Sequence, residues 1–167
     1  MAWPSLSPIW SMWSMQEPSL SLADNPDRHF IERFIADGAR DLPVPGSPLA
    51  RQLYMRLLRA SHGAVDASFQ IGMDFTQGGG VIQGGIVAAM LDFGLAFAAL
   101  SVLDTGRTAV TTSLNVNYLR PASTGLYHVH AVLEKQGRTL IYASAKLLDA
   151  NERPIAIASS PMAIVSM

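Results

Sequence analysis

The longest run of apolar positions in the chain covers residues 84–103. As a helix these twenty residues would span roughly 30 Å, and Asp92 is the only one of them that is ionisable at neutral pH. A helix that is apolar on all sides lies in a membrane or in the core of a protein. The run is long enough to cross a bilayer, but its central aspartate, its many small residues and the lack of a flanking Lys/Arg cluster argue against insertion. We therefore predict a core helix.

Strand-like alternation of apolar and polar positions surrounds this helix. One strand is predicted before it, from Gly63 to about Asp74. Strands after it are predicted at 108–119, 126–135, 139–149 and 154–165. Pro121 ends the first of these, since proline cannot continue a central ladder, and the short turns between the others favour an antiparallel meander. This order of elements predicts an α+β domain in which one sheet wraps one helix.

The pattern before residue 61 is different. Residues 1–26 are rich in Ser, Pro, Trp and Met and lack a basic n-region, so we expect a disordered or extended arm and no secretory signal. Residues 27–37 place apolar side chains at helical spacing before Gly38, which predicts a short amphipathic helix with a glycine C-cap. A second short helix is predicted at 49–59. The chain is thus divided into an arm (1–26), a helical extension (27–60) and the α+β domain (61–167).

Composition restricts the class of protein and its partners. The 167 residues include 49% hydrophobic and only 15% charged residues, which suits one globular domain with surface buried against other subunits. We therefore expect an oligomer, and whether it is a homodimer or a homotetramer stays open. A formal charge of -1 gives no reason to expect nucleic acid or an anionic membrane as a partner. The lack of cysteine excludes disulfides and thiolate chemistry, and it fits the cytoplasmic location that we expect as well as it fits export.

Glycines at 78–80 and 84–85 precede the core helix and raise the question of a phosphate-binding loop. They fit neither a G-x-G-x-x-G register nor a P-loop, and the later strands are not separated by helices as a doubly wound sheet requires. Glycines at a helix start do leave backbone N–H groups bare and convergent. Such groups suit an oxyanion or a polarised carbonyl. The helix start is therefore a candidate electrophile site.

Asp92 shares a face of the helix with this site. Gly84, Ala88 and Asp92 follow one another at i, i+4 spacing. A buried, isolated carboxylate is costly unless it is hydrogen-bonded or opens on a cleft, and such groups are enriched at functional sites. Two interpretations stay open from spacing alone: a functional carboxylate, or an aspartate satisfied by Ser or Asn from a neighbouring strand.

Three stretches of the sequence resemble the hotdog-fold thioesterases of the phenylacetate-pathway (PaaI-like) type. They are VIQGGIVAAMLDFGLAFA, TTSLNVNYLRPAS and KQGRTLIYASAKLLDANERPIAIAS. The glycine pair, the acid eight residues later, the N-x-x-Y-x-x-P strand end and the G-R turn all fall in register, and the resemblance covers residues 65–165. It implies a hotdog fold, an antiparallel sheet around one long central helix, and an acyl-CoA thioesterase that needs no cofactor.

The resemblance also implies roles for individual residues. The backbone N–H of Gly84 would polarise the thioester carbonyl, and Asp92 would act as nucleophile or as general base on water. Thr111 would orient the water or the carboxylate. Arg138, in the G-R turn, would meet the phosphates of CoA, with Arg120 as a second candidate. Active sites of this family lie across a dimer interface, so that Asp92 of one subunit would face the Gly84 loop of another.

Two positions depart from the family pattern. Gln83 stands where the family usually has histidine, and Gln77 falls near a position often held by asparagine. Glutamine can donate a hydrogen bond but does not titrate near neutral pH. We expect hydrolysis to be retained, because Asp92 and Gly84 supply the two groups that the reaction most needs. The alternative is a non-catalytic acyl-CoA-binding or assembly protein, and a hotdog dehydratase ranks last because no histidine stands near Gly84.

A metal site is a further possibility raised by two histidines. His128 and His130 lie at i, i+2 on one face of a predicted strand, as two metal ligands would. No third ligand is indicated by the sequence. We predict polar histidines on a strand face and no metal.

Overall fold

The computed structural model describes residues 24–167, so most of the predicted arm lies outside the described residues. The helices of the described part are α1 (Pro26–Ala36), α2 (Pro48–Gln52) and α3 (Gly84–Leu100), with a 3-10 turn at Met73–Phe75. The strands are β1 (Leu42–Pro43), β2 (Arg56–Ser61), β3 (Ala64–Ile71), β4 (Arg107–Thr111), β5 (Asn115–Tyr118), β6 (Gly125–Gln136), β7 (Leu140–Asp149) and β8 (Pro154–Ser166).

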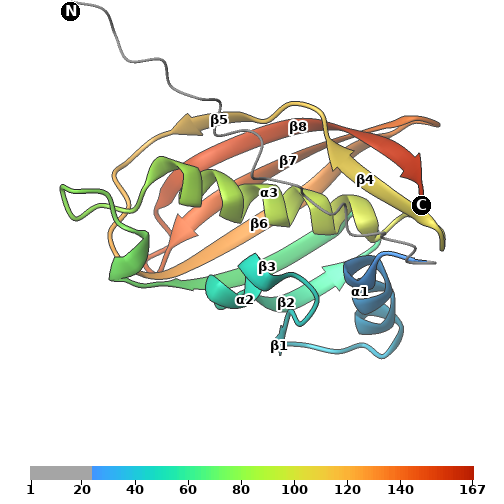
Figure 1. Cartoon of the computed structure of the whole chain (residues 1–167), viewed down its shortest axis with the longest axis horizontal. Helices are drawn as coiled ribbons and strands as arrows, with labels where there is room; N and C mark the ends of the chain where they lie inside the picture. Colours follow the sequence, from blue (N-terminus) through green and yellow to red (C-terminus); the bar gives the residue numbers. More distant parts are fainter. Residues whose placement is uncertain (1–23) are drawn as a thin grey trace, which may run out of the picture.

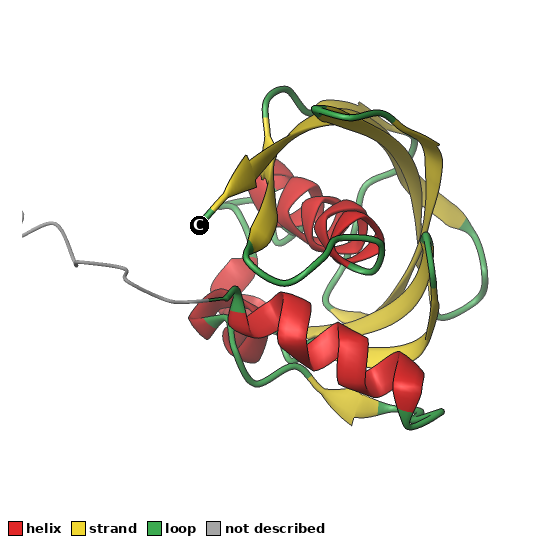
Figure 2. Ribbon diagram, turned by 90° about the vertical axis from the view of Figure 1, so that its right-hand side faces the viewer, coloured by secondary structure: helices red, strands yellow, loops and turns green. Residues whose placement is uncertain are grey.

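One curved sheet wraps around α3 (Figures 1 and 2). Its order is β1-β2-β3-β6-β7-β8-β4, and β5 pairs with β8 beside β4. Every pairing is antiparallel. The predicted α+β architecture, with a meander of β6, β7 and β8 and a sheet around one helix, is confirmed.

The long apolar helix is a core element, as predicted. Most of its side chains are buried against the sheet. A Cβ added at Gly94 would lie 2.4 Å from Val129 Cγ1 on β6, so only glycine permits this close approach of helix and sheet. The helix ends at Leu100 rather than at residue 103. The next residue is Ser101, whose hydroxyl donates to the Ala98 carbonyl and accepts from the Gly63 N–H. Among residues 24–167, no helix has the length and apolar character needed to cross a membrane.

The N-terminal extension is only partly helical. The helix predicted at 27–37 is confirmed as α1, whose N-cap Asn25 accepts from the N–H groups of Asp27 and Arg28. The helix predicted at 49–59 is wrong beyond Gln52. Tyr54 has a φ of 50°, a left-handed conformation that stops α2, and β2 then pairs with β3 and buries Leu57. The sheet therefore begins before residue 61.

The strand predicted at 108–119 is two strands. β4 and β5 both pair with β8, and residues 112–114 separate them. The interruption lies opposite Pro161 of β8, which has no N–H to donate to the ladder. Instead, the N–H and the hydroxyl of Thr112 both donate to the Pro161 carbonyl, at 3.1 and 2.8 Å. The pairing along this edge of the sheet is thus interrupted at the proline, between β4 and β5.

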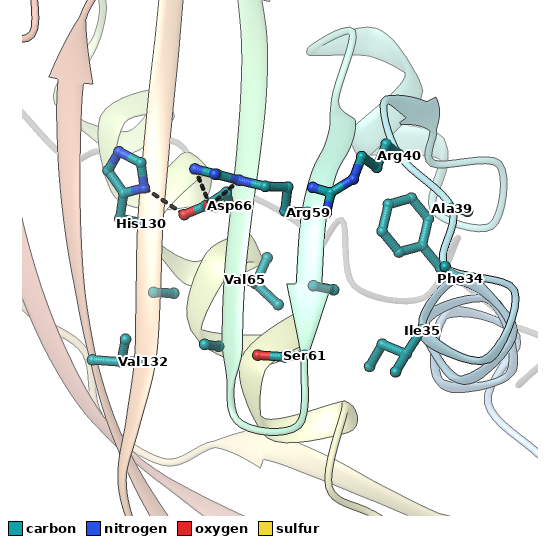
Figure 3. Close-up of a pocket in the computed structure, with 14 residues that line it drawn as sticks. Phe34, Ile35, Ala39, Arg40, Arg59, Ser61, Val65, Asp66, His130 and Val132 are labelled. Carbon is teal, nitrogen blue, oxygen red and sulfur yellow. Dashed lines mark hydrogen bonds and ion pairs between the residues drawn. The ribbon is translucent and has the colours of Figure 1, made fainter.

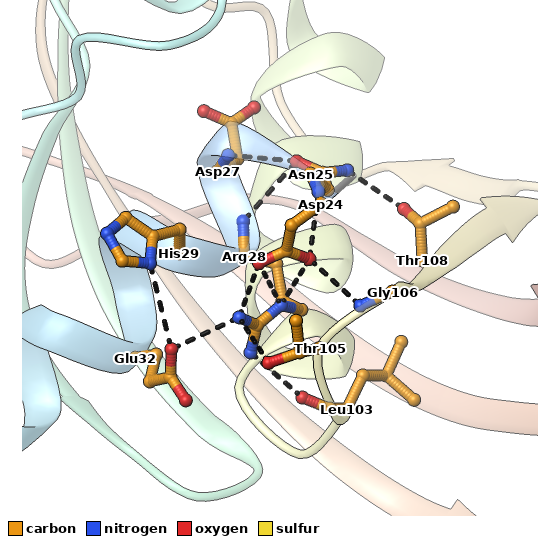
Figure 4. Close-up of polar contacts among 10 residues, drawn as sticks. All are labelled: Asp24, Asn25, Asp27, Arg28, His29, Glu32, Leu103, Thr105, Gly106 and Thr108. Atoms are coloured by element: carbon orange, nitrogen blue, oxygen red, sulfur yellow. Dashed lines mark hydrogen bonds and ion pairs between the residues drawn. The ribbon is translucent and has the colours of Figure 1, made fainter. Parts of the chain in front are cut away.

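Arg28 fastens α1 to the loop between α3 and β4 (Figure 4). Its guanidinium is buried and bonds the Asp24 carboxylate at 2.5–2.9 Å. It also donates to the Leu103 carbonyl and to the Thr105 hydroxyl, each at 3.3 Å. The hydrogen bond from Arg28 lowers the pKa of Asp24 to about 2. The Asn25 side-chain amide donates to the Thr108 hydroxyl on β4 at 2.9 Å. The residues that begin α1 therefore also hold the start of β4.

Candidate active site

Asp92 is held by a threonine from the neighbouring strand. The Thr111 hydroxyl, at the end of β4, donates to Asp92 Oδ1 at 2.9 Å. No other hydrogen bond to this carboxylate is present among the described residues, so Oδ2 is available to water or to a substrate. The structure thus brings together the helix acid and the hydroxyl residue that the sequence singled out.

Asp92 lies on the stripe of α3 that the sheet leaves uncovered. Gly85 is exposed, and Ala88, Asp92 and Ala96, which follow it at helical spacing, are half-buried. The remaining faces of the helix are packed against the sheet. The carboxylate therefore faces outward from a single chain, along the same side of α3 as the glycine pair.

The start of α3 presents free backbone donors. Gln83 is the N-cap but its side chain makes no capping bond, and its N–H donates to the Phe75 carbonyl at 2.9 Å. The first N–H groups of a helix have no partner within the helix. Within residues 24–167, the N–H groups of Gly84 and Gly85 have no other acceptor either. Two adjacent donors are thus available at the helix mouth.

A shallow pocket of about 290 Å³ lies beside these donors. It is lined by Val81, Ile82, Gly84, Val87, Tyr118, Leu119, Arg120, Pro121 and Ala122. The Tyr118 hydroxyl donates to the Gly84 carbonyl at 2.9 Å. Arg120 lies at the same pocket and donates to the Pro154 carbonyl at 2.5 Å. The pocket is mainly apolar, with one cation at its edge.

The other predicted site residues lie farther from the helix mouth or face solvent. Gln83 is exposed, and the Gln77 side chain accepts from the Gly79 N–H at 2.8 Å within its own loop. Arg138 is exposed in the β6–β7 turn. This turn and the start of α3 lie at opposite ends of the molecule (Figure 1). Within one chain the structure thus places Arg120, and not Arg138, next to the glycine pair.

A single chain also keeps Gly84 and Asp92 apart. They are separated by eight residues of α3, which is about 12 Å along the helix axis at 1.5 Å per residue. A group at the Gly84 N–H cannot touch Asp92 of the same chain. Both residues lie on one face of the helix, but Gly84 and Asp92 of the same chain cannot both contact one carbonyl group of a substrate.

Tyr118 is the site residue that the sequence reasoning missed. Its motif, N-x-x-Y-x-x-P, was recognised, but spacing along the chain does not indicate that the end of β5 reaches the start of α3. The one feature of the sequence that could have indicated a site role was the residue type. Tyrosine has a polar tip, and Tyr118 ends a strand of the sheet that wraps α3.

A second hollow lies on the outer face of the sheet, between α1 and strands β2, β3 and β6 (Figure 3). Its volume is about 460 Å³, and Asp66 is one of the residues that line it. Asp66 contacts His130 Nδ1 at 2.5 Å and Arg59 Nε at 2.9 Å. His128 lies 3.5 Å from Glu152 instead. Each histidine thus has its own carboxylate, and in the described part of the chain no three His, Cys, Asp or Glu residues could hold a metal ion.

Residues 79–156 match the model of the thioesterase superfamily. This part of the chain is thus similar to the thioesterase superfamily. The match includes the glycine pair at the start of α3, Asp92 and Thr111, and it ends within β8. The predicted hotdog fold and its PaaI-like character are confirmed by the superfamily match and the structural likenesses together.

Two solved structures extend the likeness beyond the matched residues. A phenylacetic acid degradation-related protein from Ralstonia eutropha JMP134 is 27% identical, with a TM-score of 0.68 over 71% of this chain and 91% of that one. A thioesterase family protein from Silicibacter pomeroyi is 25% identical, with a TM-score of 0.70 over 86% of this chain and 98% of that one.

Among curated proteins, acyl-coenzyme A thioesterase 13 of Homo sapiens is 29% identical over 92 residues, 54% of this chain and 65% of the human protein. The chain spans 55–65% of the length of the curated superfamily relatives that it matches.

Proposed function

We propose that this chain is a thioesterase that hydrolyses acyl-CoA to the free acid and CoA. The observation that carries the proposal is the carboxylate of Asp92, which Thr111 holds on the uncovered stripe of a helix whose first N–H groups are free. A relative that is 29% identical is named an acyl-coenzyme A thioesterase, which supports CoA as the thiol.

The chemistry needs an electrophile activator and a base or nucleophile. The Gly84 N–H would donate to the thioester oxygen, which gains negative charge as the carbonyl carbon is attacked. If Asp92 acts as general base, it takes a proton from water while the water oxygen bonds to that carbon. If it acts as nucleophile, it forms an anhydride that water then hydrolyses. In both routes the C–S bond breaks, and the sulfur leaves as a thiolate that is protonated.

Two copies of the chain would build each site. Attack and polarisation act on one carbonyl group within hydrogen-bond distances of about 3 Å, whereas Gly84 and Asp92 of one chain are about 12 Å apart along α3. Asp92 of one copy would therefore face Gly84 of another. The sheet also ends at β4, an edge strand with an exposed Val110, and Tyr118 and Leu119 are exposed at the end of β5, farther along the same edge. A homo-oligomer would cover these side chains.

The phosphates of CoA would meet an arginine. Arg120 adjoins the Gly84 pocket in the same chain, and Arg138 is exposed at the opposite end of the molecule, where it would serve a site shared with a second copy. Gln83 lies exposed at the helix mouth and Gln77 in the loop before it, so both are available to donate amide hydrogen bonds to the substrate. Neither titrates, which leaves proton transfer to Asp92.

The test is the Asp92→Asn variant, assayed by thiol release from a panel of aryl-, short-chain and long-chain acyl-CoA esters. Loss of the carboxylate removes the base or nucleophile, so turnover should fall by at least about a hundredfold. Asp104→Asn is the matched control, because Asp104 is exposed just beyond the end of α3. It should retain wild-type turnover.

Unchanged turnover in Asp92→Asn would overturn the assigned role of Asp92. Tight binding of acyl-CoA by the wild-type chain without thiol release from any ester would overturn hydrolysis and select the non-catalytic acyl-CoA-binding protein.

A further inference from the structure

We propose that Tyr118 is a positioning residue for the thioester site, a role that rests on the proposed function. Its hydroxyl donates to the Gly84 carbonyl at 2.9 Å. Its ring also packs against Gly84, since a Cβ built there would contact the Tyr118 hydroxyl at 3.5 Å. No other side chain in the described part of the chain hydrogen-bonds the first turn of α3.

The peptide that Tyr118 holds is one of the two that form the helix mouth. The Gly84 carbonyl and the Gly85 N–H belong to the same planar peptide group. A donor that fixes the direction of the carbonyl therefore also fixes the direction of the N–H. This matters because two consecutive glycines have more conformational freedom than any other pair of residues, and Gln83 contributes no side-chain cap.

The same hydrogen bond has an electrostatic effect. A donor to a peptide carbonyl polarises the peptide and strengthens its N–H as a donor. The oxygen of a thioester carries more negative charge in the transition state than in the bound substrate. In this proposal the Gly85 N–H is a second donor to that oxygen, beside the Gly84 N–H. Strengthening the Gly85 donor therefore lowers the barrier more than it improves substrate binding.

The sheet holds Tyr118 in place independently of this bond. Tyr118 is the last residue of β5 and pairs with Ala156 of β8. The residue is 53% exposed, so its hydroxyl is not required for packing of the core. Removal of the hydroxyl alone should leave the fold intact and change only the first turn of α3.

The experiment compares Tyr118→Phe with Tyr142→Phe in acyl-CoA hydrolysis. Tyr142 is a matched control on β7, with 46% of its side chain exposed and no hydrogen bond to its hydroxyl within residues 24–167. Tyr118→Phe should lower kcat about five- to tenfold, the cost of one hydrogen bond of the ordinary net strength. KM should stay within about twofold, because the bond acts mainly in the transition state. Tyr142→Phe should match the wild type.

A second readout does not depend on activity. In NMR spectra of protein labelled with ¹⁵N-glycine, Tyr118→Phe should move the Gly85 amide proton upfield and speed its exchange with solvent, while Tyr142→Phe should not. An unchanged kcat, or a change confined to KM, would overturn the catalytic consequence of the bond. An unchanged Gly85 amide would overturn the positioning role itself. If the wild-type chain releases no thiol, the proposed function fails and the Gly85 amide still decides whether Tyr118 positions the peptide.

Discussion

At the scale of single residues, the carboxylate of Asp92 depends on one hydroxyl. Thr111 donates to Asp92 Oδ1 at 2.9 Å. Thr111→Val keeps the shape of the side chain and removes the donor. We expect kcat to fall about three- to tenfold, because one hydrogen bond of about 1 kcal/mol no longer orients the carboxylate. Steady-state thiol release measures this loss.

Thr112→Val is the matched control for that measurement. Thr112 is the next residue, and its hydroxyl donates to the Pro161 carbonyl at 2.8 Å, away from Asp92. Its loss should leave kcat near the wild-type value. Equal losses in the two variants would assign the effect to the edge of the sheet rather than to Asp92.

The sequence was most informative about single residues whose type is unusual for their surroundings. Asp92 is identifiable because it is the one charge in an apolar helix, and the family pattern pointed to Thr111, which the structure brings within hydrogen-bond distance. Tyr118 is not identifiable in this way, because an exposed tyrosine at a strand end is unremarkable without the three-dimensional path of β5 past the start of α3. Its contact joins residues 34 positions apart.

At the scale of elements, α1 is attached to the rest of the molecule by the buried side chain of Arg28. Only 3% of this side chain is exposed, and its partner Asp24 is 19% exposed. Arg28→Ala removes the guanidinium donor of the Asp24 carboxylate, which keeps only its bonds from backbone N–H groups, and it also removes the donor to the Leu103 carbonyl. We expect a loss of about 2–3 kcal/mol in the free energy of unfolding, measured by urea denaturation at pH 7.

Arg33→Ala on the same helix is the control, because its side chain is 67% exposed and its pairing with Asp37 is long, at 3.6 Å. Its effect should stay within about 0.5 kcal/mol. The pKa of Asp24 in the folded protein is about 2, below its ordinary value of 3.8. The contribution of the pair is therefore complete above pH 3.8 and is lost as the pH falls through about 2. A difference between wild type and Arg28→Ala that did not shrink as the pH falls through about 2 would contradict this account.

The elements predicted correctly carry a clear pattern within their own residues. α3 is a long unbroken apolar run, and β6, β7 and β8 alternate apolar and polar positions over 12, 10 and 13 residues. The mistakes are short segments in which distant pairing decides the structure. Residues 56–59 read as helix in isolation, but pairing with β3 makes them a strand. Pro161 breaks the strand predicted at 108–119 from the other side of the ladder, and no local pattern reveals a proline that lies some fifty residues away in the sequence.

At the scale of the whole molecule, the proposed site needs more than one chain. Gly84 and Asp92 are about 12 Å apart on α3, so the proposed reaction requires one residue from each of two copies. Neither the periodicity nor the composition of one sequence indicates where a second copy of the chain would bind. For this reason the sequence predicts more of the fold than of the proposed shared site. Complementation between two inactive variants tests the requirement directly.

The two variants are Asp92→Asn and Gly84→Pro. Proline removes the N–H of residue 84 and is well tolerated at the first position of a helix, and Gln83 before it has an extended ψ of 134°, which a following proline requires. Gly84→Ala is the control, because it keeps the N–H and its Cβ would make an ordinary contact with Tyr118 at 3.5 Å. Each of the two test variants alone should be inactive, whereas Gly84→Ala should retain activity.

Co-expression with two affinity tags isolates molecules that contain one copy of each variant. In such a dimer one site combines an intact Gly84 with an intact Asp92 from the other copy, and the second site has neither. Activity should return to about half that of the wild type, as expected for one working site in a symmetric pair. A chain that carries both substitutions, co-purified with Asp92→Asn, should stay inactive. If the mixed dimer of the two single variants were also inactive, each site would lie within one chain, and the proposed sharing of Gly84 and Asp92 between copies would be wrong.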